Sequence, residues 1–118
     1  MLTSLEIATL AVKALDSKQA KDISVLKTDK VTSLADYFVL ATASSSTQAK
    51  TLVEEVDKIL SENGEPALRR EGVRSGGWTL LDFGCVIVHV FSAELREFYS
   101  LDRLWSDAEK LNVEELLK

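Results

Sequence analysis

The chain has 118 residues, of which 46% are hydrophobic and 28% charged, and its formal net charge is −5. This length and composition predict one ordinary globular domain over residues 1–118. The acidic balance argues against a general nucleic-acid binder, which needs clustered lysine and arginine, and favours a partner with a basic surface.

Cysteine usage and the N-terminus bear on the compartment. Cys85 is the only cysteine, so no disulfide can form within the chain, which fits a reducing environment. Residues 1–18 include Glu6 and Asp16 and lack the pattern of a signal peptide. The longest strongly apolar stretch, residues 85–91, is too short to span a bilayer. We therefore expect a soluble cytoplasmic protein, with an organellar copy that has lost its transit peptide as the alternative.

The first half predicts two helices and two strands. Thr3 and Glu6 match a capping box, and apolar residues at helical spacing predict a helix over residues 4–17. Residues 22–27 alternate and predict an edge strand, whereas residues 36–43 predict a strand buried on both faces. A second capping box predicts a helix that begins after Ser45 and ends at Asn63-Gly64, before Pro66.

The second half predicts three strands, over residues 67–71, 78–83 and 86–91, with Gly84-Cys85 as a tight hairpin connection. We expect a short helix over residues 93–99, a helical turn over 101–107 and a frayed end over 113–118. This order mixes a parallel crossover with antiparallel hairpins. It predicts an α/β (or α+β) fold with one mixed five-stranded sheet flanked by helices.

The search for catalytic chemistry finds isolated candidates. His89 lies mid-strand, where alternation places it with Ile87 and Phe91; a general base is one interpretation, and a sheet-face histidine bonded to a neighbour is the favoured one. Cys85 has no partner base at an obvious spacing. One cysteine and one histidine are too few for a metal site, so we expect no metal and no cofactor.

Two further segments have alternative interpretations. The run Ser44 to Thr47 opens a helix and could hold an anion, but without a glycine-rich loop it better fits helix capping. Asp82 could meet a partner's cation or could cap the turn at Gly84, and the sequence does not separate these roles. Four large aromatics gather in this half and could be interface anchors or core residues, namely Trp78, Phe83, Tyr99 and Trp105. Trp78 is expected at a rim and Trp105 in the core.

Motifs over about residues 5–106 resemble one family. They are, in chain order, AKDI at 20–23, TSLADYFVLAT at 32–42, Ser44-Ser45, Glu71-Gly72, WTLLDFG at 78–84, VIVHVF at 86–91, REFY at 96–99 and LDRLW at 101–105. Together they closely resemble the RsfS/Iojap family of ribosomal silencing factors. The chain departs from the family pattern at Cys85, where an acidic residue is usual, and at Ala43, where glycine is usual.

The resemblance implies a fold and a function. Family members bind ribosomal protein L14 (uL14) on the large subunit, which prevents joining of the small subunit and represses translation. They have a sheet that looks like a nucleotidyltransferase core, are not known as catalysts, and often form homodimers. The departure at Cys85 puts an acidic contact at the hairpin in doubt.

Residues and resemblance together predict a non-enzymatic binding module. We expect aromatic anchors and acids from one strand and the following helix to contact L14, namely Trp78, Leu80, Asp82, Phe83, Glu94, Leu95 and Tyr99. The alternative is a nucleotidyltransferase-like, nucleotide-binding enzyme, which would need a phosphate-gripping turn near Ser44 and a pair of metal-binding acids on adjacent strands. Only Asp82 is well placed for such a pair, since Asp36 is distant in sequence. A generic dimeric adaptor for another basic partner is a third interpretation.

Overall fold

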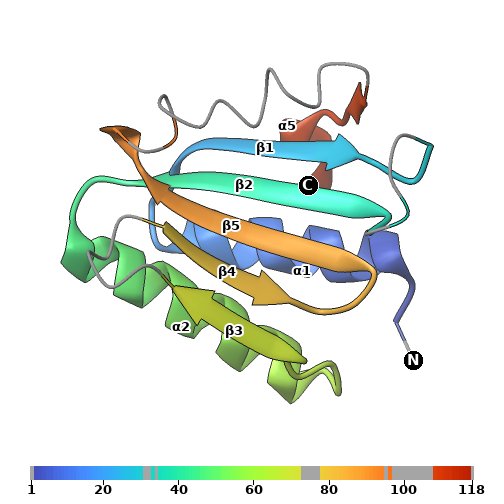
Figure 1. Cartoon of the computed structure of the whole chain (residues 1–118), viewed down its shortest axis with the longest axis horizontal. Helices are drawn as coiled ribbons and strands as arrows, with labels where there is room; N and C mark the ends of the chain where they lie inside the picture. Colours follow the sequence, from blue (N-terminus) through green and yellow to red (C-terminus); the bar gives the residue numbers. More distant parts are fainter. Residues whose placement is uncertain are drawn as a thin grey trace.

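A computed structural model describes residues 2–30, 33, 35–72, 78–94, 96 and 108–117 (Figure 1). In chain order its elements are α1 (Ser4–Ser17), β1 (Lys21–Lys27), β2 (Tyr37–Ala43), α2 (Ser46–Glu62), β3 (Arg69–Gly72), β4 (Trp78–Asp82), β5 (Val86–Ser92), β6 (Glu109–Lys110) and α5 (Val113–Leu116). Among the described residues, no helix is both long enough and apolar enough to cross a membrane.

The strands form one mixed sheet in the order β3-β4-β5-β2-β1-β6. The central pair, β2 and β5, is parallel, and the other neighbours are antiparallel. The predicted mixed sheet with flanking helices is confirmed. Within the described part of the chain the sheet has six strands, one more than expected, because Glu109 and Lys110 pair with Lys27 and Leu26 of β1. For the same reason β1 is not the edge strand that its sequence predicted.

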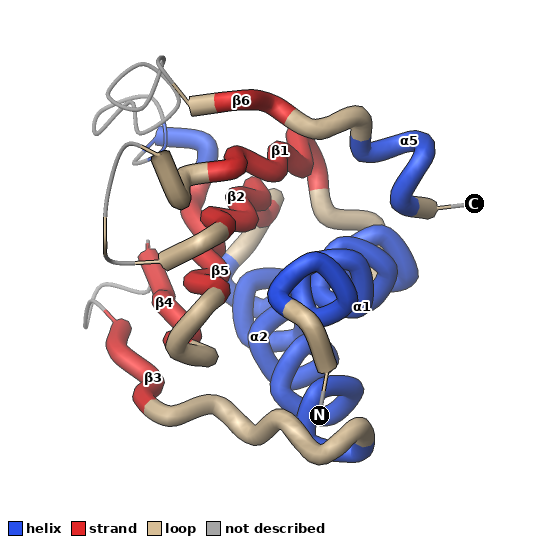
Figure 2. Tube along the Cα trace, turned by 90° about the vertical axis from the view of Figure 1, so that its right-hand side faces the viewer, coloured by secondary structure: helices blue, strands red, loops and turns tan. Residues whose placement is uncertain are grey.

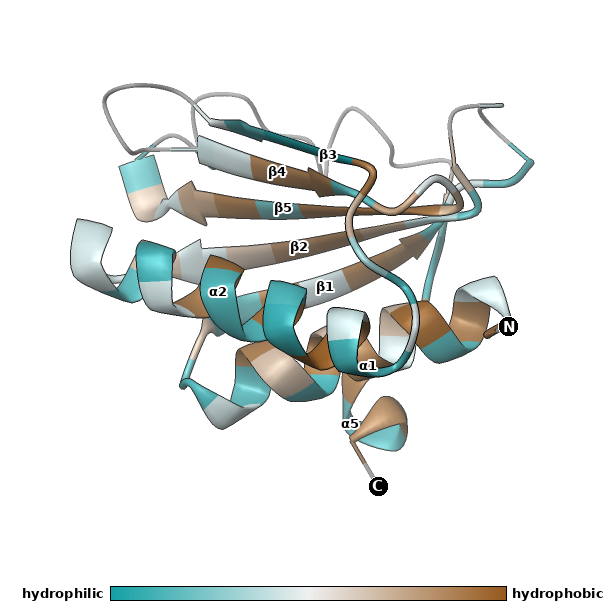
Figure 3. Ribbon diagram, turned by 90° about the horizontal axis from the view of Figure 1, so that it is seen from below, coloured by the Kyte–Doolittle hydropathy of each residue, from teal (hydrophilic) through white to brown (hydrophobic). Residues whose placement is uncertain are grey.

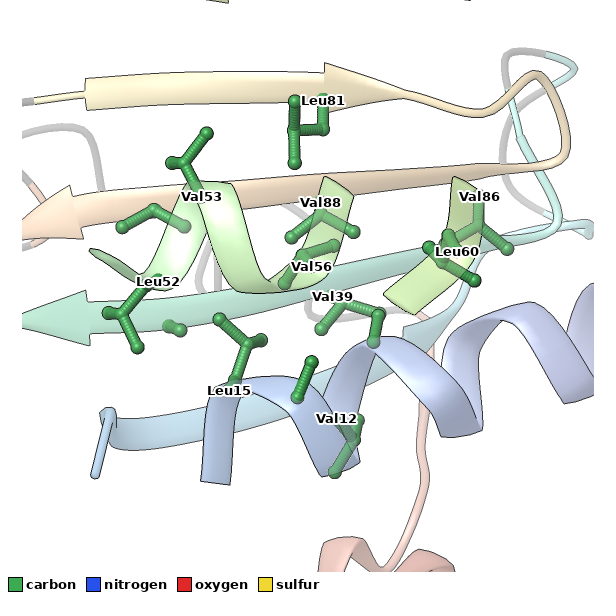
Figure 4. Packing of buried hydrophobic residues seen from close by; sticks show 14 of the residues in the cluster. Val12, Leu15, Val39, Leu52, Val53, Val56, Leu60, Leu81, Val86 and Val88 are labelled. Atoms are coloured by element: carbon green, nitrogen blue, oxygen red, sulfur yellow. The ribbon is translucent and has the colours of Figure 1, made fainter. Parts of the chain in front are cut away.

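Helices α1 and α2 pack side by side on one face of the sheet (Figure 2). The buried cluster between these layers includes Val12 and Leu15 of α1, Leu52 and Val56 of α2, and Val88 of β5 (Figure 4). All five side chains are fully buried. The main hydrophobic core therefore lies on the helix-covered face.

A second, smaller buried cluster lies on the opposite face of the sheet, and its members are Leu26, Ala35, Phe38, Leu40 and Phe91. Trp78 and Ile87 pack against it. Along β5 the residues therefore alternate between the two clusters as predicted, with Val86, Val88 and Val90 on the helix side. The centre of the sheet is buried on both faces.

Local signals fix where several elements begin and end. The Thr3 side chain accepts a hydrogen bond from the Glu6 N–H, and the Glu6 carboxylate accepts one from the Thr3 N–H, which completes the predicted capping box. At Gly64 a φ of +83° lets the chain leave α2. Gly84, with a φ of +86°, permits the tight β4–β5 hairpin, in which the Phe83 N–H donates to the Val86 carbonyl at 2.9 Å.

The C-terminal part differs from the expectation. In place of a frayed end, α5 begins after Asn112, whose side chain accepts from the Glu115 N–H, and this helix contacts α1 and β1. The preceding Leu111 N–H also donates to the Val25 carbonyl. Of the helix expected over residues 93–99, Ala93, Glu94 and Arg96 are helical. The rest of it, and the turn expected over 101–107, lie outside the described residues.

The helix-side core gives a direct stability prediction. Leu52→Ala removes a fully buried side chain of α2 and should lower the free energy of unfolding by about 2–5 kcal/mol, because the cavity cannot close completely. The matched control is Leu5→Ala on α1, where the side chain is 44% exposed and the loss should stay within about 1 kcal/mol. Urea denaturation of both variants measures the difference, and equal losses would contradict this assignment of the core.

Candidate functional site

Three of the predicted binding residues share the face of β4 that points away from α1 and α2. Trp78, Leu80 and Asp82 alternate with the buried Leu81 and are each partly exposed. Their partners across the β4–β5 ladder are Phe91, His89 and Ile87, respectively. A partly exposed row of one aromatic, one aliphatic and one acidic side chain thus lies beside the second buried cluster.

The other predicted residues lie elsewhere. Phe83 is 7% exposed and packs in the helix-side core with Leu81, so it is not part of this surface. The alternation along residues 78–83 already pointed to that placement. Glu94 is exposed and follows β5 at the end of the sheet where Trp78 lies opposite Phe91. Leu95 and Tyr99 lie outside the described residues, as does Trp105.

A shallow hollow of about 210 Å³ lies next to Trp78, and Glu71, Gly72 and Leu80 also line it. Glu71 comes from β3, where it pairs with Leu80 across the ladder. Sequence reasoning missed Glu71 as a site residue, because only the pairing of β3 with β4 brings it beside Leu80. The hollow combines an apolar wall with a carboxylate at its rim, which suits a partner side chain that has an apolar stem and a positive end.

Charges beside the hollow are partly compensated within the chain. The Asp82 carboxylate accepts the Gly84 N–H at 2.7 Å and the Arg69 guanidinium at 3.0 Å. Arg69 also lies 3.5 Å from the Glu71 carboxylate. Asp82 therefore caps the hairpin turn, as one of the two interpretations held, and a contact with a partner's cation stays a prediction. With two carboxylates and one guanidinium, the group as a whole has an excess negative charge.

His89 lies on β5 beside the exposed row of β4, and the favoured interpretation of it is confirmed. Its Nδ1 accepts a hydrogen bond from the Trp78 indole N–H at 3.2 Å. The imidazole also packs against the rings of Phe38 and Phe91, with centroids 5.2 and 5.8 Å away. Burial lowers the pKa of His89 from 6.5 to about 4, so the ring is neutral at physiological pH.

Arg96 anchors the segment that follows β5. Its guanidinium donates to the Asp22 carbonyl and, at 3.0 Å each, to the hydroxyls of Thr42 and Ser24. These acceptors belong to β1 and β2, so the start of the segment that contains Glu94 is tied to the body of the sheet. This role of Arg96 had no signal in the sequence, because its acceptors lie more than fifty residues away.

The remaining candidates for chemistry have structural roles. The Ser45 hydroxyl accepts the Gln48 N–H, and the Gln48 side-chain oxygen accepts from Ser44, which favours helix capping over anion binding. Burial raises the pKa of the Cys85 thiol, and the carboxylates of Asp36 and Glu65 raise it further, so the thiol stays protonated. Among the described residues, no three His, Cys, Asp or Glu side chains come close enough to hold a metal ion.

Burial of neutral His89 predicts a pH dependence of stability. The unfolded chain takes up a proton near pH 6.5, whereas the folded protein resists it down to about pH 4. The unfolded state therefore binds more protons in this window, and the free energy of unfolding should fall as the pH is lowered, by roughly 3 kcal/mol in all.

The measurement is urea denaturation at several pH values between 7 and 4, for the wild type and for His89→Phe. Carboxylates titrate in both proteins, so the contribution of His89 is the difference between the two curves. Parallel curves would show that His89 does not contribute to the loss.

Comparison with known proteins relates this geometry to a family. A family model described as "Ribosomal silencing factor during starvation" (RsfS) matches residues 2–118. A Halalkalibacterium halodurans protein named ribosomal silencing factor RsfS is 33% identical over 116 residues, covering 98% of this chain and 99% of that protein. A Mus musculus protein named mitochondrial assembly of ribosomal large subunit protein 1 is 29% identical over 100 residues, covering 82% of this chain and 44% of its own.

The fold is shared as well. A crystal structure of a Chromobacterium violaceum protein superposes with a TM-score of 0.86 at 39% identity, covering 89% of this chain and 88% of that one. Sequence and structure agree over nearly the whole length, and the resemblance read from the motifs is confirmed. The chain belongs to the RsfS family of ribosomal silencing factors.

Proposed function

We propose that this protein binds the large ribosomal subunit through ribosomal protein L14 and prevents the small subunit from joining, which represses translation. Family membership supports a role in ribosome silencing. The name of the mouse relative, which refers to the large subunit, supports that subunit as the partner. The homodimer that the family resemblance implies stays a prediction.

One observation carries the proposal: Trp78, Leu80 and Asp82 lie on one partly exposed face, beside a hollow rimmed by Glu71. Large aromatics next to a pocket are typical anchors of protein interfaces, because they bury much apolar area with little loss of rotamer freedom. The neighbouring carboxylates suit a basic partner. Ribosomal proteins that bind ribosomal RNA are basic, since they neutralise phosphates.

The proposed mechanism is steric and needs no chemical step. The chain measures 33 × 32 × 27 Å along its principal axes. A body of this size on the surface where the subunits meet would hold them apart. Docking through strand residues, which a buried sheet holds in place, would keep the obstacle rigid.

The first prediction concerns the exposed row. Trp78→Ala should weaken binding to purified large subunits by at least about 30-fold, the effect of losing an anchor worth ~2 kcal/mol or more. Leu80→Ala should weaken it in the same direction, since Leu80 lines the same hollow. The matched control is Leu5→Ala, which removes a partly exposed leucine from α1, on the helix side of the sheet.

Co-sedimentation with large subunits measures binding, and density-gradient profiles of mixed subunits measure joining. Wild type and Leu5→Ala should reduce the fraction of joined ribosomes, whereas Trp78→Ala should not. If both Trp78→Ala and Leu80→Ala bind like the wild type, the surface is misassigned. If saturating wild-type protein leaves joining unchanged, the proposed function itself is wrong.

A second prediction separates charge from packing. Glu94→Gln should lower the association rate with large subunits roughly two- to threefold at low salt, because a negative rim charge attracts a basic partner during encounter. The effect should shrink as salt rises. Glu54→Gln is the matched control, since Glu54 is an exposed acid on α2. Stopped-flow or surface-binding kinetics measure both rates, and equal slowing by the two variants would argue for a net-charge effect with no defined site.

A further inference from the structure

The Trp78 side chain is joined to the sheet beneath it by a specific hydrogen bond. Trp78 and His89 are diagonal neighbours on β4 and β5, because Trp78 pairs with Phe91 and Leu80 pairs with His89. The indole N–H donates to His89 Nδ1 at 3.2 Å, and the indole ring stacks on Phe91 with centroids 5.2 Å apart and planes 26° apart. The imidazole plane is nearly parallel to the Phe91 ring, at an interplanar angle of 7°.

This geometry fixes which nitrogen of His89 carries the proton. A neutral imidazole has one donor and one acceptor nitrogen, and Nδ1 is the acceptor here, so the proton lies on Nε2. Nε2 is buried, and no hydrogen-bond partner for it lies among the described residues. A general base needs a free nitrogen within reach of a substrate. In His89 one nitrogen accepts from the indole and the other is enclosed, which argues against a catalytic role.

His89 is also too deep to act as a contact residue. The side chain is 5% exposed, whereas Trp78 above it is partly exposed and lines the hollow. The imidazole can therefore influence a bound protein through the partly exposed side chains beside it, Trp78 and Leu80, and of these two Trp78 is the one hydrogen-bonded to it. An aromatic anchor that is already held in its bound orientation loses less conformational freedom on binding, so orientation raises affinity without adding a contact.

We propose that His89 is a positioning residue of the docking surface, and that its Nδ1 holds the Trp78 indole in the orientation in which the partner meets it. The inference rests on the proposed function, because it takes Trp78 as an anchor for the large subunit. It assigns the buried histidine to recognition, and it predicts that the acceptor at the Nδ1 position matters more than the aromatic ring that carries it.

The test uses two substitutions of His89 in the full-length protein. His89→Phe keeps a ring of similar size and removes the acceptor, whereas His89→Asn places a side-chain oxygen near the former Nδ1. Binding to purified large subunits should weaken roughly five- to tenfold in His89→Phe, the order expected for one lost hydrogen bond, and should recover to within about threefold of wild type in His89→Asn.

A control separates this effect from a general loss of stability. Val88→Ala alters the adjacent residue of β5, which is fully buried on the helix side, away from the indole. It should lower the free energy of unfolding while the affinity of the folded protein stays at the wild-type value. Urea denaturation establishes the fraction of each variant that is folded, so that affinities are compared for folded protein only.

Two further measurements read the hydrogen bond itself. The indole N–H resonance of Trp78, assigned by its disappearance in Trp78→Phe, should shift and exchange faster with solvent in His89→Phe, and return towards its wild-type position in His89→Asn. The double variant Trp78→Phe/His89→Phe should bind no more weakly than Trp78→Phe alone, because the donor is already gone.

The outcomes separate the two claims. Normal binding by His89→Phe, no difference between His89→Phe and His89→Asn, or additive losses in the double variant would each overturn the positioning role. If Trp78→Ala binds normally, the role of Trp78 as an anchor fails first, and the indole resonance still reports whether His89 holds the indole. Should His89→Phe fail to fold, the same resonance and binding assays compare His89→Asn with Trp78→Phe. His89→Asn should keep the indole resonance near its wild-type position and bind more tightly than Trp78→Phe, and the opposite result would overturn the positioning role.

Discussion

Both long helices pack on the same face of the sheet, and this asymmetry decides what the two faces can do. The helix-covered face buries small and branched aliphatic side chains, which fill the space between two layers. The opposite face has no described helix lying across it, yet Leu40 and Phe91 at its centre are completely buried. Large rings, above all Phe38, His89 and Phe91, pack against one another there. These rings form a packed layer that contributes to the burial of the face opposite α1 and α2.

This layer also links the rigid core of the chain to its partly exposed apolar surface. Trp78 completes the ring layer from the side of β4 and remains partly exposed, so one residue belongs to both the fold and the surface. On β3, Glu71 lines the same hollow as Trp78, and Asp82 of β4 is fixed by the hairpin turn and by Arg69. Side chains supported in this way need little rearrangement to meet a partner. Arg96 extends the same rigidity to the start of the segment beyond β5.

Much of this arrangement follows from local rules in the sequence. The capping signals gave the start of α1, and the Gly84-Cys85 connection gave the hairpin. A two-residue loop also fixes the register of β4 on β5, so the pairing of Leu80 with His89 was within reach of the sequence. Phe83 was assigned to the surface although the alternation placed it with Leu81 in the core.

Other features depend on pairings that no local rule specifies. The register of β3 on β4 spans a longer connection, so the position of Glu71 beside Leu80 could not be predicted. The sixth strand needs only Glu109 and Lys110, which is too short for a periodic pattern to reveal. The hydrogen bond between Trp78 and His89 depends on side-chain rotamers, which follow from the packed ring layer as a whole.

The end strand β3 has a bearing on how the protein behaves in a crowded solution. An unpaired sheet edge invites other chains to add strands, which leads to aggregation. In the described sheet β3 forms one end, is only four residues long, and carries Arg69, Arg70 and Glu71 beside the largely hydrophobic β4 and β5 (Figure 3). Its shortness and its charged side chains discourage the addition of further strands at this border. The partly exposed side chains of Trp78 and Leu80 therefore lie near a border of the sheet that is protected against strand addition.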